Sequence, residues 1–247
     1  MAEQGSVQSV ERVFSIIEQM CREEESSVTG LALATGLNKT TVFRFLNTLV
    51  GMGYVVKNDK TDMYSLTLKF LRISSKKLAS YDIQKQMHST LQRLSGECSE
   101  TVHLVERNGN RVVYIDKFES DTNSVRMVSR IGKSLDIFTT AVGKAMLSHL
   151  SNVEIKNLWN EFQHKKKTPH TITELEVFMK EIDSIRECGY AVDNEENELE
   201  VRCVAVAIPD ANGEYRYAIS VSAPKNRMTD EKVDFVSEQL KTLSDKA

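Results

Sequence analysis

The stretch "GLNKTTVFRFLNTLVGMGYV", residues 36–55, decides the fold of the N-terminal part of the chain. Its apolar residues recur at the three-and-four spacing of one buried helical face, namely Val42, Phe45, Leu46, Leu49 and Met52. The opposite face carries threonines, an asparagine, an arginine and a phenylalanine, and no acidic residue. A face that met only water would usually carry glutamates, so we expect this helix to contact a partner.

The segments before this stretch predict two further helices. Residues 7–23 show the apolar period of an amphipathic helix. Their expected buried face comprises Val10, Val13, Phe14, Ile17 and Met20. A short second helix follows, capped by Ser27 or Thr29 and ended by Gly36, since glycine accepts a positive φ. Asn38 is expected to cap the third helix.

Two β-prone runs follow the third helix. Residues 54–57 and 63–67 enclose the charged, turn-forming "NDKTD" and predict a hairpin. Three helices followed by a hairpin are typical of a winged helix-turn-helix, which is a DNA-binding fold. We therefore predict a DNA-binding domain over residues 1–67.

The charge distribution agrees with this prediction. The net charge is −3, yet residues 38–77 contain eight basic residues against two acidic ones. A basic segment on an acidic protein is expected where one part of the chain meets phosphates. Lysines that only keep helix surfaces soluble would give the same count, so charge alone does not decide the function.

The outer face of the third helix supplies the predicted DNA contacts. Thr40, Thr41 and Asn47 can reach bases or phosphates, and Arg44 can bind a guanine or a phosphate. Lys57 in the hairpin is expected near an adjacent groove. The full set of predicted DNA contacts is Lys39, Thr40, Thr41, Phe43, Arg44, Asn47 and Lys57. A solvated helix face with one stray aromatic residue is the alternative.

The rest of the chain predicts a linker helix and a second domain. Residues 68–81 contain no Gly or Pro, which favours a helix over a flexible linker. Helices are expected at residues 82–96, 139–150, 152–162, 173–187 and 229–243. Period-two alternation predicts strands at residues 101–107, 111–118, 124–130, 190–193, 201–209 and 214–223. Segregated strands and helices indicate an α+β domain, residues 82–247, with a six-stranded, mainly antiparallel sheet.

Several classes of protein are disfavoured. No stretch approaches the about 20 apolar residues of a membrane span, and the N-terminus shows no signal peptide. The four cysteines are scattered without a CxxC pair, which favours reduced thiols in a cytoplasmic protein. The five histidines show no metal-ligand spacing, and no cofactor-binding motif is present. We therefore expect neither a metal nor a cofactor.

Catalytic candidates are few. His103 alternates with apolar residues and is expected to be a hydrogen-bonded residue of the sheet. Cys203, flanked by apolar residues on a strand, is expected to be a buried structural thiol. The two could form a nucleophile pair, but the sequence offers no third group to orient them.

Two polar segments are candidates for ligand binding. The run "DNEENELE", residues 193–200, holds five carboxylates. Most of it is expected to be a solvated loop, although one or two members could turn inward because it joins two strands. "TTAVGKAM", residues 139–146, opens a helix whose free amides could bind a carboxylate. A plain N-cap, closely packed through Gly143, is an equally good interpretation.

Together these segments resemble the IclR family of bacterial transcription regulators over nearly the whole chain. The resemblance is carried by the helix-turn-helix quoted above, by "YSLTLKFL", by "TTAVGKAML" and by "GYAVDNEENELEVRCVAVAIPDANGE" with "AISVSAP". Within the family, "YSLTLKF", "VRMVSRIGK" and "DNEENE" resemble regulators of sugar-acid catabolism, including those that sense 2-keto-3-deoxygluconate.

The resemblance implies a winged helix that dimerises and a GAF-like C-terminal domain that binds a small organic acid. Homodimers or homotetramers are implied, the second association running through the C-terminal domains. The effector-binding residues implied by motif are Met127, Thr140, Ala141, Val142, Asp193, Val201, Cys203, Ser220 and Ser222. Thr140, Ala141 and Val142 would offer a hydroxyl and amides to the carboxylate. Glu200 departs from the family, which usually has glycine at this position.

We therefore expect a cytoplasmic regulator that binds double-stranded operator DNA, acts as a repressor, and responds to a sugar acid such as 2-keto-3-deoxygluconate. No catalytic residue and no membrane association are expected. The alternative function is a small-molecule-processing enzyme of GAF-like shape that uses Cys203.

Overall fold

The computed structural model describes residues 7–78, 82–120, 127 and 129–244. Contacts within the chain divide it into two compact units, Met1–Ser80 and Tyr81–Ala247, and each is described by itself. No helix in the described ranges is long and apolar enough to cross a bilayer. All four cysteines are free thiols.

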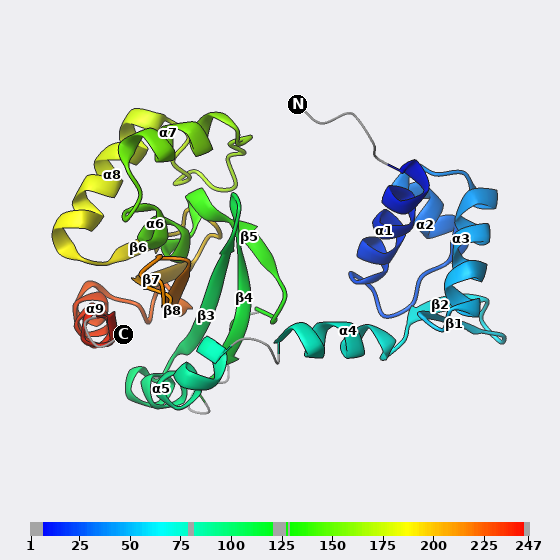
Figure 1. The fold of residues 1–247 in the computed structure, drawn as a ribbon, viewed down its shortest axis with the longest axis horizontal. Coiled ribbons are helices and arrows are strands. Elements are labelled where there is room, and N and C mark those ends of the chain that lie inside the picture. The colour runs from blue at the N-terminus through cyan, green and yellow to red at the C-terminus, as the bar shows by residue number, and fades with distance from the viewer. Residues whose placement is uncertain (1–6, 79–81, 121–126, 128, 245–247) are drawn as a thin grey trace. The chain divides into compact units, whose positions relative to one another are not determined.

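The first unit is the predicted winged helix-turn-helix (Figure 1). Its elements are α1 (Gln8–Met20), α2 (Val28–Thr35), α3 (Lys39–Gly51), β1 (Val55–Asn58), β2 (Met63–Leu66) and α4 (Lys69–Leu78). The Ser27 side chain caps α2 by accepting from the Gly30 amide at 3.0 Å. Asn38 caps α3 in the same way, at 2.8 Å from the Thr41 amide. Gly36 ends α2 with φ +69°, the left-handed conformation that glycine permits.

The buried face of α1 differs from the prediction. Val10 and Phe14 are 52% and 57% exposed, whereas Ile16 is fully buried. The helix packs on the rest of the unit through the neighbouring stripe that holds Ile16 and Met20, so the stripe through Val10 and Phe14 faces outward. Met52, predicted to be buried, is 53% exposed because it lies beyond the last residue of α3.

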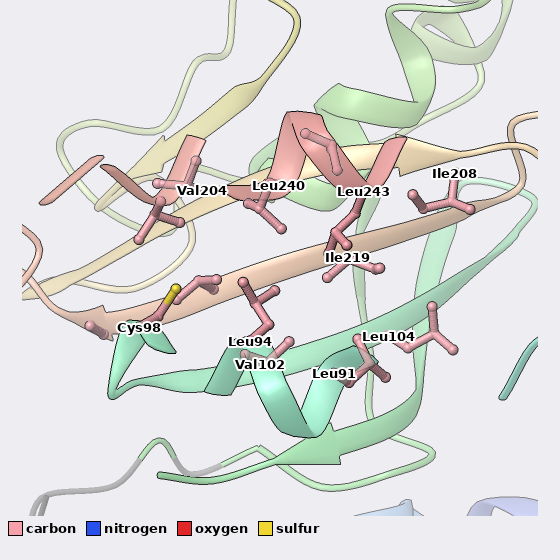
Figure 2. Packing of buried hydrophobic residues seen from close by; sticks show 14 of the residues in the cluster. Leu91, Leu94, Cys98, Val102, Leu104, Val204, Ile208, Ile219, Leu240 and Leu243 are labelled. Carbon is pink, nitrogen blue, oxygen red and sulfur yellow. The ribbon is translucent and has the colours of Figure 1, made fainter. Parts of the chain in front are cut away.

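The second unit is built on an antiparallel sheet with the order β5-β4-β3-β8-β7-β6, which confirms the six-stranded prediction. The strands are β3 (Thr101–Asn108), β4 (Arg111–Phe118), β5 (Ser134–Asp136), β6 (Ala191–Asn194), β7 (Val201–Ile208) and β8 (Tyr217–Pro224). The helices are α5 (Asp82–Cys98), α6 (Ala141–Leu147), α7 (Asn152–Asn160), α8 (Leu175–Cys188) and α9 (Asp230–Ser244), with a 3-10 turn η1 (Ile137–Thr139). α5 and α9 pack on one face of the sheet, and α6, α7 and α8 lie over the other (Figures 1 and 2).

One predicted strand, residues 124–130, is not found among the described residues. Met127, Ser129 and Arg130 are not in a strand, and the remaining residues of that range lie outside the described part. Side-chain bonds hold this segment instead, since Lys117 Nζ donates to the carbonyl oxygens of Met127 and Ser129 at 2.9 and 2.8 Å. The sixth strand, β5, begins after a turn at Gly132 and pairs with β4.

Alternation along the strands separates an apolar face of the sheet from one that is partly polar. In β7, Val204, Val206 and Ile208 face α5 and α9 and contribute to the core in Figure 2. The alternate residues Ala205 and Ala207 belong to the core under α6. Small alanine side chains let α6 lie close to the sheet.

Candidate functional site

The outer face of α3 is the candidate DNA-binding surface. The predicted contacts Lys39, Thr40, Phe43, Arg44 and Asn47 are all exposed, and Thr41 is half-buried. The opposite side of the helix is buried through Val42, Leu46 and Leu49. The arrangement presents short polar groups and a guanidinium together on one helical face, as base-edge and phosphate contacts require.

Lys57 is placed differently from the residues of α3. It lies in β1, and its ammonium pairs with Asp62 across the hairpin at 2.5 Å. This ion pair offsets part of the charge that we predicted for DNA contact. Lys57 remains a predicted DNA contact, for which Asp62 would compete with a phosphate.

A cavity on the polar part of the sheet brings together all the residues that the sequence implied for effector binding. Met127, Thr140, Ala141, Val142, Asp193, Val201, Cys203, Ser220 and Ser222 all line it. Strand pairing explains the grouping, because Asp193 pairs with Cys203 across β6 and β7, and Cys203 pairs with Ser222 across β7 and β8. Paired residues on neighbouring strands point to the same face of the sheet.

The cavity has further lining residues that the sequence did not identify. They are His103, Tyr114, Ser129, Lys133, Leu135, Asn197 and Glu198. His103 pairs with Ser220 across β3 and β8. This pairing would have placed His103 in the cavity, but it requires the register of two strands that are far apart in sequence.

His103 is the hydrogen-bonded sheet residue that was predicted, and it is neutral. Its Nε2 lies 2.7 Å from Ser129 Oγ, and its Nδ1 lies 3.5 Å from Ser222 Oγ. Burial, with a smaller effect from the nearby Lys117 charge, lowers the pKa of the imidazole to about 3. His103 can therefore exchange hydrogen bonds with a ligand without carrying a positive charge.

Cys203 lines the same cavity but is not an activated nucleophile. Burial raises the pKa of the thiol, and the Asp193 charge adds to that effect. A catalytic thiolate needs a lowered pKa and a base beside it. The alternative enzyme function therefore has no support in the geometry.

The acidic run is more buried than predicted. Asp193, Glu195 and Glu196 are 4%, 3% and 6% exposed, so three of the five carboxylates turn inward. Asp193 Oδ1 accepts from the amides of Glu196 and Asn197 at 2.8 and 3.4 Å. Burial, together with the Glu196 charge, raises the pKa of Asp193 to about 7. Near neutral pH this carboxyl can hold a proton.

Glu196 turns inward because it provides a negative charge to a buried lysine. Lys144, in α6, is fully buried, and its ammonium pairs with Glu196 and with Glu181 of α8, the latter at 2.8 Å. Burial opposes the charge of Lys144, but the two carboxylates outweigh it and raise its pKa. This ionic cluster, absent from the sequence predictions, ties α6 to α8 and to the acidic run.

Thr140 fulfils the N-cap role that was left open. Its hydroxyl accepts from the Gly143 amide at 3.2 Å and donates to the Asp136 carbonyl at 3.1 Å. Gly143 itself cannot be replaced without strain, because an added Cβ would lie 1.8 Å from the Ile137 carbonyl oxygen. The first amides of α6 have no partner within the helix, so they can donate to a ligand beside the cap.

Glu200 shows why glycine is usual at its position. Its φ is +60°, in the left-handed region that side chains disfavour. The backbone on both sides is held, since the Glu200 amide donates to Glu195 Oε1 at 2.9 Å and its carbonyl accepts from the Lys225 amide at 2.8 Å. The turn therefore keeps its shape despite the glutamate.

The enclosed space between the lining residues is about 40 Å³. This volume holds a few water molecules, whereas pockets for small-molecule ligands are typically about 300–1,000 Å³. Any ligand larger than a few atoms must displace some of the lining side chains.

Among the described residues, no group of three histidine, cysteine, aspartate or glutamate side chains could hold a metal ion. The cavity instead offers hydroxyls, an imidazole, two carboxyls and a lysine, which is a set suited to hydrogen bonding with a polar organic molecule.

Comparisons with known proteins agree on one family. The family model described as "Bacterial transcriptional regulator IclR C-terminal" matches residues 75–247. The model described as "IclR helix-turn-helix domain" matches residues 9–59. Both units of the chain are thus matched separately.

Individual relatives extend over nearly the whole chain. The HTH-type transcriptional regulator KdgR of Escherichia coli (strain K12) is 35% identical over 241 residues, 98% of this chain and 91% of that protein. KdgR of Dickeya chrysanthemi is 36% identical over 233 residues, 94% of this chain and 76% of that protein. The crystal structure of the Thermotoga maritima IclR matches with a TM-score of 0.78 at 32% identity, covering 96% of both chains. These relatives are transcriptional regulators and not enzymes.

Proposed function

The chain belongs to the IclR family of bacterial transcriptional regulators, and from that premise we propose that it is a repressor controlled by a sugar acid such as 2-keto-3-deoxygluconate. As a member of the family it binds DNA through its helix-turn-helix and a small-molecule effector through its C-terminal domain. The proposal concerns which effector it binds and which residues make the contacts.

The chemistry of the cavity lining carries the proposal. A sugar acid has a carboxylate at one end and several hydroxyls. Ser220, Ser222 and the neutral His103 can exchange hydrogen bonds with hydroxyls. The start of α6, with Ala141 and Val142, and the ammonium of Lys133 suit the carboxylate.

Protonation of Asp193 makes the cavity compatible with an anion. An ionised Asp193 would repel the effector carboxylate in a space that excludes water. With its pKa raised to about 7, Asp193 can bind a proton and then donate to a hydroxyl. The similarity to KdgR over nearly the full chain supports an effector of the same class as the sugar-acid regulators of the family.

The small cavity implies that the effector selects another arrangement of its walls. Because the space between the described lining residues is about 40 Å³, a sugar acid binds only where lining side chains such as Met127 and Ser129 withdraw. A ligand shifts such an equilibrium by no more than its differential affinity for the two states. Binding of the effector therefore stabilises an opened form of the effector domain. The closed form is the one that the domain adopts without effector.

DNA contact is assigned to Lys39, Thr40, Thr41, Phe43, Arg44, Asn47 and Lys57.

A homodimer is proposed through the exposed apolar stripe of α1, where Val10 and Phe14 are more than half exposed. A homotetramer would need a second contact through the effector domains. Operator DNA lies in the cytoplasm of a bacterium, so the protein is expected there.

A thermal-shift screen of the full chain tests the proposal. The panel contains 2-keto-3-deoxygluconate, gluconate, pyruvate and glyoxylate, with glucose as an uncharged control. We expect stabilisation by the sugar acids and release of operator DNA at the same concentrations. Stabilisation by glucose alone, or by none of the acids, would show that the effector belongs to another class.

A further inference from the structure

The loop between α7 and α8 contacts two walls of the effector cavity, although none of its residues lines the cavity. Thr168 Oγ1 donates to the Glu195 carbonyl at 2.6 Å, and Thr171 Oγ1 donates to the Glu196 carbonyl at 2.7 Å. Lys167 Nζ donates to Asn197 Oδ1 at 2.7 Å. Three side chains of this loop thus hold the turn that follows β6 and carries Asn197.

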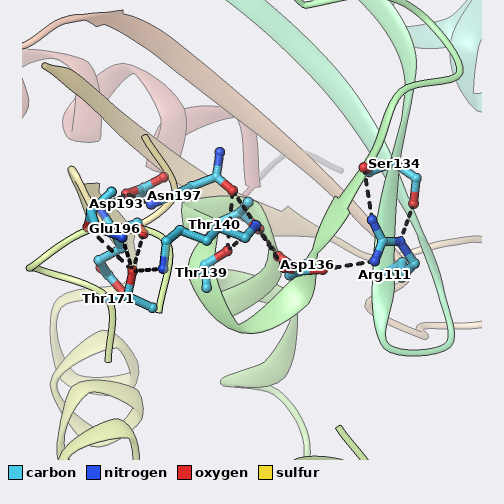
Figure 3. A network of polar contacts seen from close by, with 11 residues as sticks. Arg111, Ser134, Asp136, Thr139, Thr140, Thr171, Asp193, Glu196 and Asn197 are labelled. Atoms are coloured by element: carbon cyan, nitrogen blue, oxygen red, sulfur yellow. Dashed lines mark hydrogen bonds and ion pairs between the residues drawn. The ribbon is translucent and has the colours of Figure 1, made fainter. Parts of the chain in front are cut away.

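Lys167 also reaches the opposite wall. Its ammonium lies 2.7 Å from Asp136 Oδ2 and 3.2 Å from Thr139 Oγ1, at the entrance to α6. Figure 3 labels these two partners, Asp136 and Thr139. Lysine has three N–H donors, and the three acceptors come from β5, from η1 and from the acidic run. Each donor has its own partner. A planar arginine or a neutral side chain could not reproduce this geometry.

The bonds continue on both sides of Lys167. Asp136 Oδ1 accepts from Arg111 Nη1 of β4 at 2.8 Å, which fixes the carboxylate that Lys167 approaches (Figure 3). On the other side, Asn197 and Thr140 both line the cavity, and Thr140 is the residue after Thr139. Lys167 therefore links the acidic run to the entrance of α6, beside the Thr139–Asn197 hydrogen bond at 3.3 Å and the Lys144–Glu196 ion pair.

We propose that Lys167 is a positioning residue for the effector cavity, holding Asn197 and the start of α6 at the separation that the ligand requires. This inference rests on the proposed effector function. The Lys167 side chain is 27% exposed, so its ion pair with Asp136 contributes little to global stability. The effect of its removal is local to the two walls.

The test compares Lys167→Met with Lys166→Met in the full chain. Lys166 is an exposed neighbour, so its substitution removes the same charge from the same loop. In the ligand-free protein, hydrogen exchange at the Glu196 and Asn197 amides should accelerate about tenfold in Lys167→Met and stay unchanged in Lys166→Met. Unchanged exchange in both variants would overturn the proposal.

Trp159 provides the control for the fold of the loop. It is the single tryptophan of the chain, and its ring stacks on His164 at 3.6 Å. Its emission should be the same in wild type and Lys167→Met. A red-shifted emission would mean that the loop has unfolded, and it would count against a positioning role.

The second arm measures affinity for 2-keto-3-deoxygluconate by calorimetry. Lys167→Met should weaken binding about five- to twentyfold, the range typical of residues that act on a site through others. Asn197→Ala should also weaken binding, and the double variant should lose less than the product of the two single losses, because Lys167 acts partly through Asn197. Losses that multiply would overturn the proposal. If wild type binds none of the acids, the effector assignment fails, and the exchange experiment still decides the role of Lys167.

Discussion

Helix α3, the predicted DNA-binding surface, and the cavity proposed for the effector use their residues in opposite ways. The outer face of α3 is drawn from 13 consecutive residues, and its side chains point away from the rest of the unit. The cavity takes its lining from segments as distant as His103 and Ser222, which are 119 positions apart. Contacts to DNA are thus separable from the fold, whereas the walls of the cavity also hold the effector domain together.

This difference sets the consequences of substitution. A residue on the outer face of α3 can be changed with little effect on the folded protein. In the effector domain, Gly143, Lys144 and Asp193 lie in or behind the cavity wall and are also buried. The five predictions that follow test this contrast, from the largest expected effect to the smallest.

Gly143→Ala should cause the largest loss. Its Cβ would lie 1.8 Å from the Ile137 carbonyl oxygen, and backbone cannot move aside cheaply. We expect a loss of more than about 4 kcal/mol in the free energy of unfolding, or no folded protein. The matched control is Gly96→Ala in α5, where a Cβ meets nothing within 4 Å; it should stabilise the protein by about 0.5–1 kcal/mol. Equal stability of the two variants in urea denaturation would contradict the close approach of α6.

Lys144→Met should come next. It leaves the buried Glu196 and the half-buried Glu181 without their shared cation. Removing one partner of a buried ion pair typically costs about 3–5 kcal/mol. Urea denaturation measures the loss, and Lys180→Met, on the exposed side of α8, serves as the control. A loss no larger than that of the control would show that the cluster is solvated.

Asp193→Asn should change how stability depends on pH. The folded pKa of Asp193 is about 7, above its ordinary value of 3.8. The stability gained from binding this proton is full below pH 3.8 and is lost as pH rises to about 7. The stability of wild type relative to Asp193→Asn should therefore fall by on the order of 4 kcal/mol across that window and be flat above it. Asp59→Asn, which removes a carboxylate from the exposed hairpin turn, is measured in parallel as the surface control. A flat difference between pH 4 and pH 7 would mean that Asp193 stays ionised.

Arg44→Ala should weaken DNA binding without affecting stability. Using a DNA fragment selected by wild type from a random library, we expect an affinity loss of about 1–3 kcal/mol if the guanidinium contacts a base. A loss that is uniform across sequences, with a salt dependence reduced by about one ion, would indicate a phosphate contact. Arg93→Ala, in α5 of the other unit, is the control. Unchanged affinity would remove Arg44 from the DNA-binding surface.

Glu200→Gly should have the smallest effect, and it should be favourable. Glycine relieves the positive φ of Glu200, while both backbone hydrogen bonds of the residue persist. The greater freedom of glycine in the unfolded chain offsets part of this gain, so we expect a rise of up to about 1 kcal/mol. Glu198→Gly, in the same turn without a positive φ, should be destabilising. A loss of stability in both variants would show that the Glu200 side chain stabilises the turn.

The sequence predicted elements where the signal is local. The caps at Ser27 and Asn38, the glycine end of α2 and the six-strand pattern all follow from neighbouring residues. The predictions that differ from the structure concern features that neighbouring residues do not decide. A periodic helix has two candidate stripes, and only packing in the first unit chose Ile16 over Val10 and Phe14. Of the predicted strand at residues 124–130, the described residues Met127, Ser129 and Arg130 are not in a strand, and the carbonyl oxygens of Met127 and Ser129 accept from Lys117, a residue of another strand.

The cavity shows the same limit more sharply. Asp193, Cys203 and Ser222 could be proposed from motifs that resemble those of the IclR family. His103 lies in no such motif, and Lys133 and Asn197 lie within "VRMVSRIGK" and "DNEENE" but were not singled out there; the place of all three depends on strand register and on loop contacts.

By itself, then, the sequence determined the winged helix-turn-helix, the α+β effector domain, the family, and the outward face of α3. Those features depend on periodicity and capping, which act over a few residues. Only the tertiary structure decided that Lys144 is buried between two carboxylates, that the acidic run turns inward, and that Lys167 joins two cavity walls. A charged side chain has the same local sequence signal in water and in a core. Its burial depends on whether distant segments bring the opposite charge to meet it.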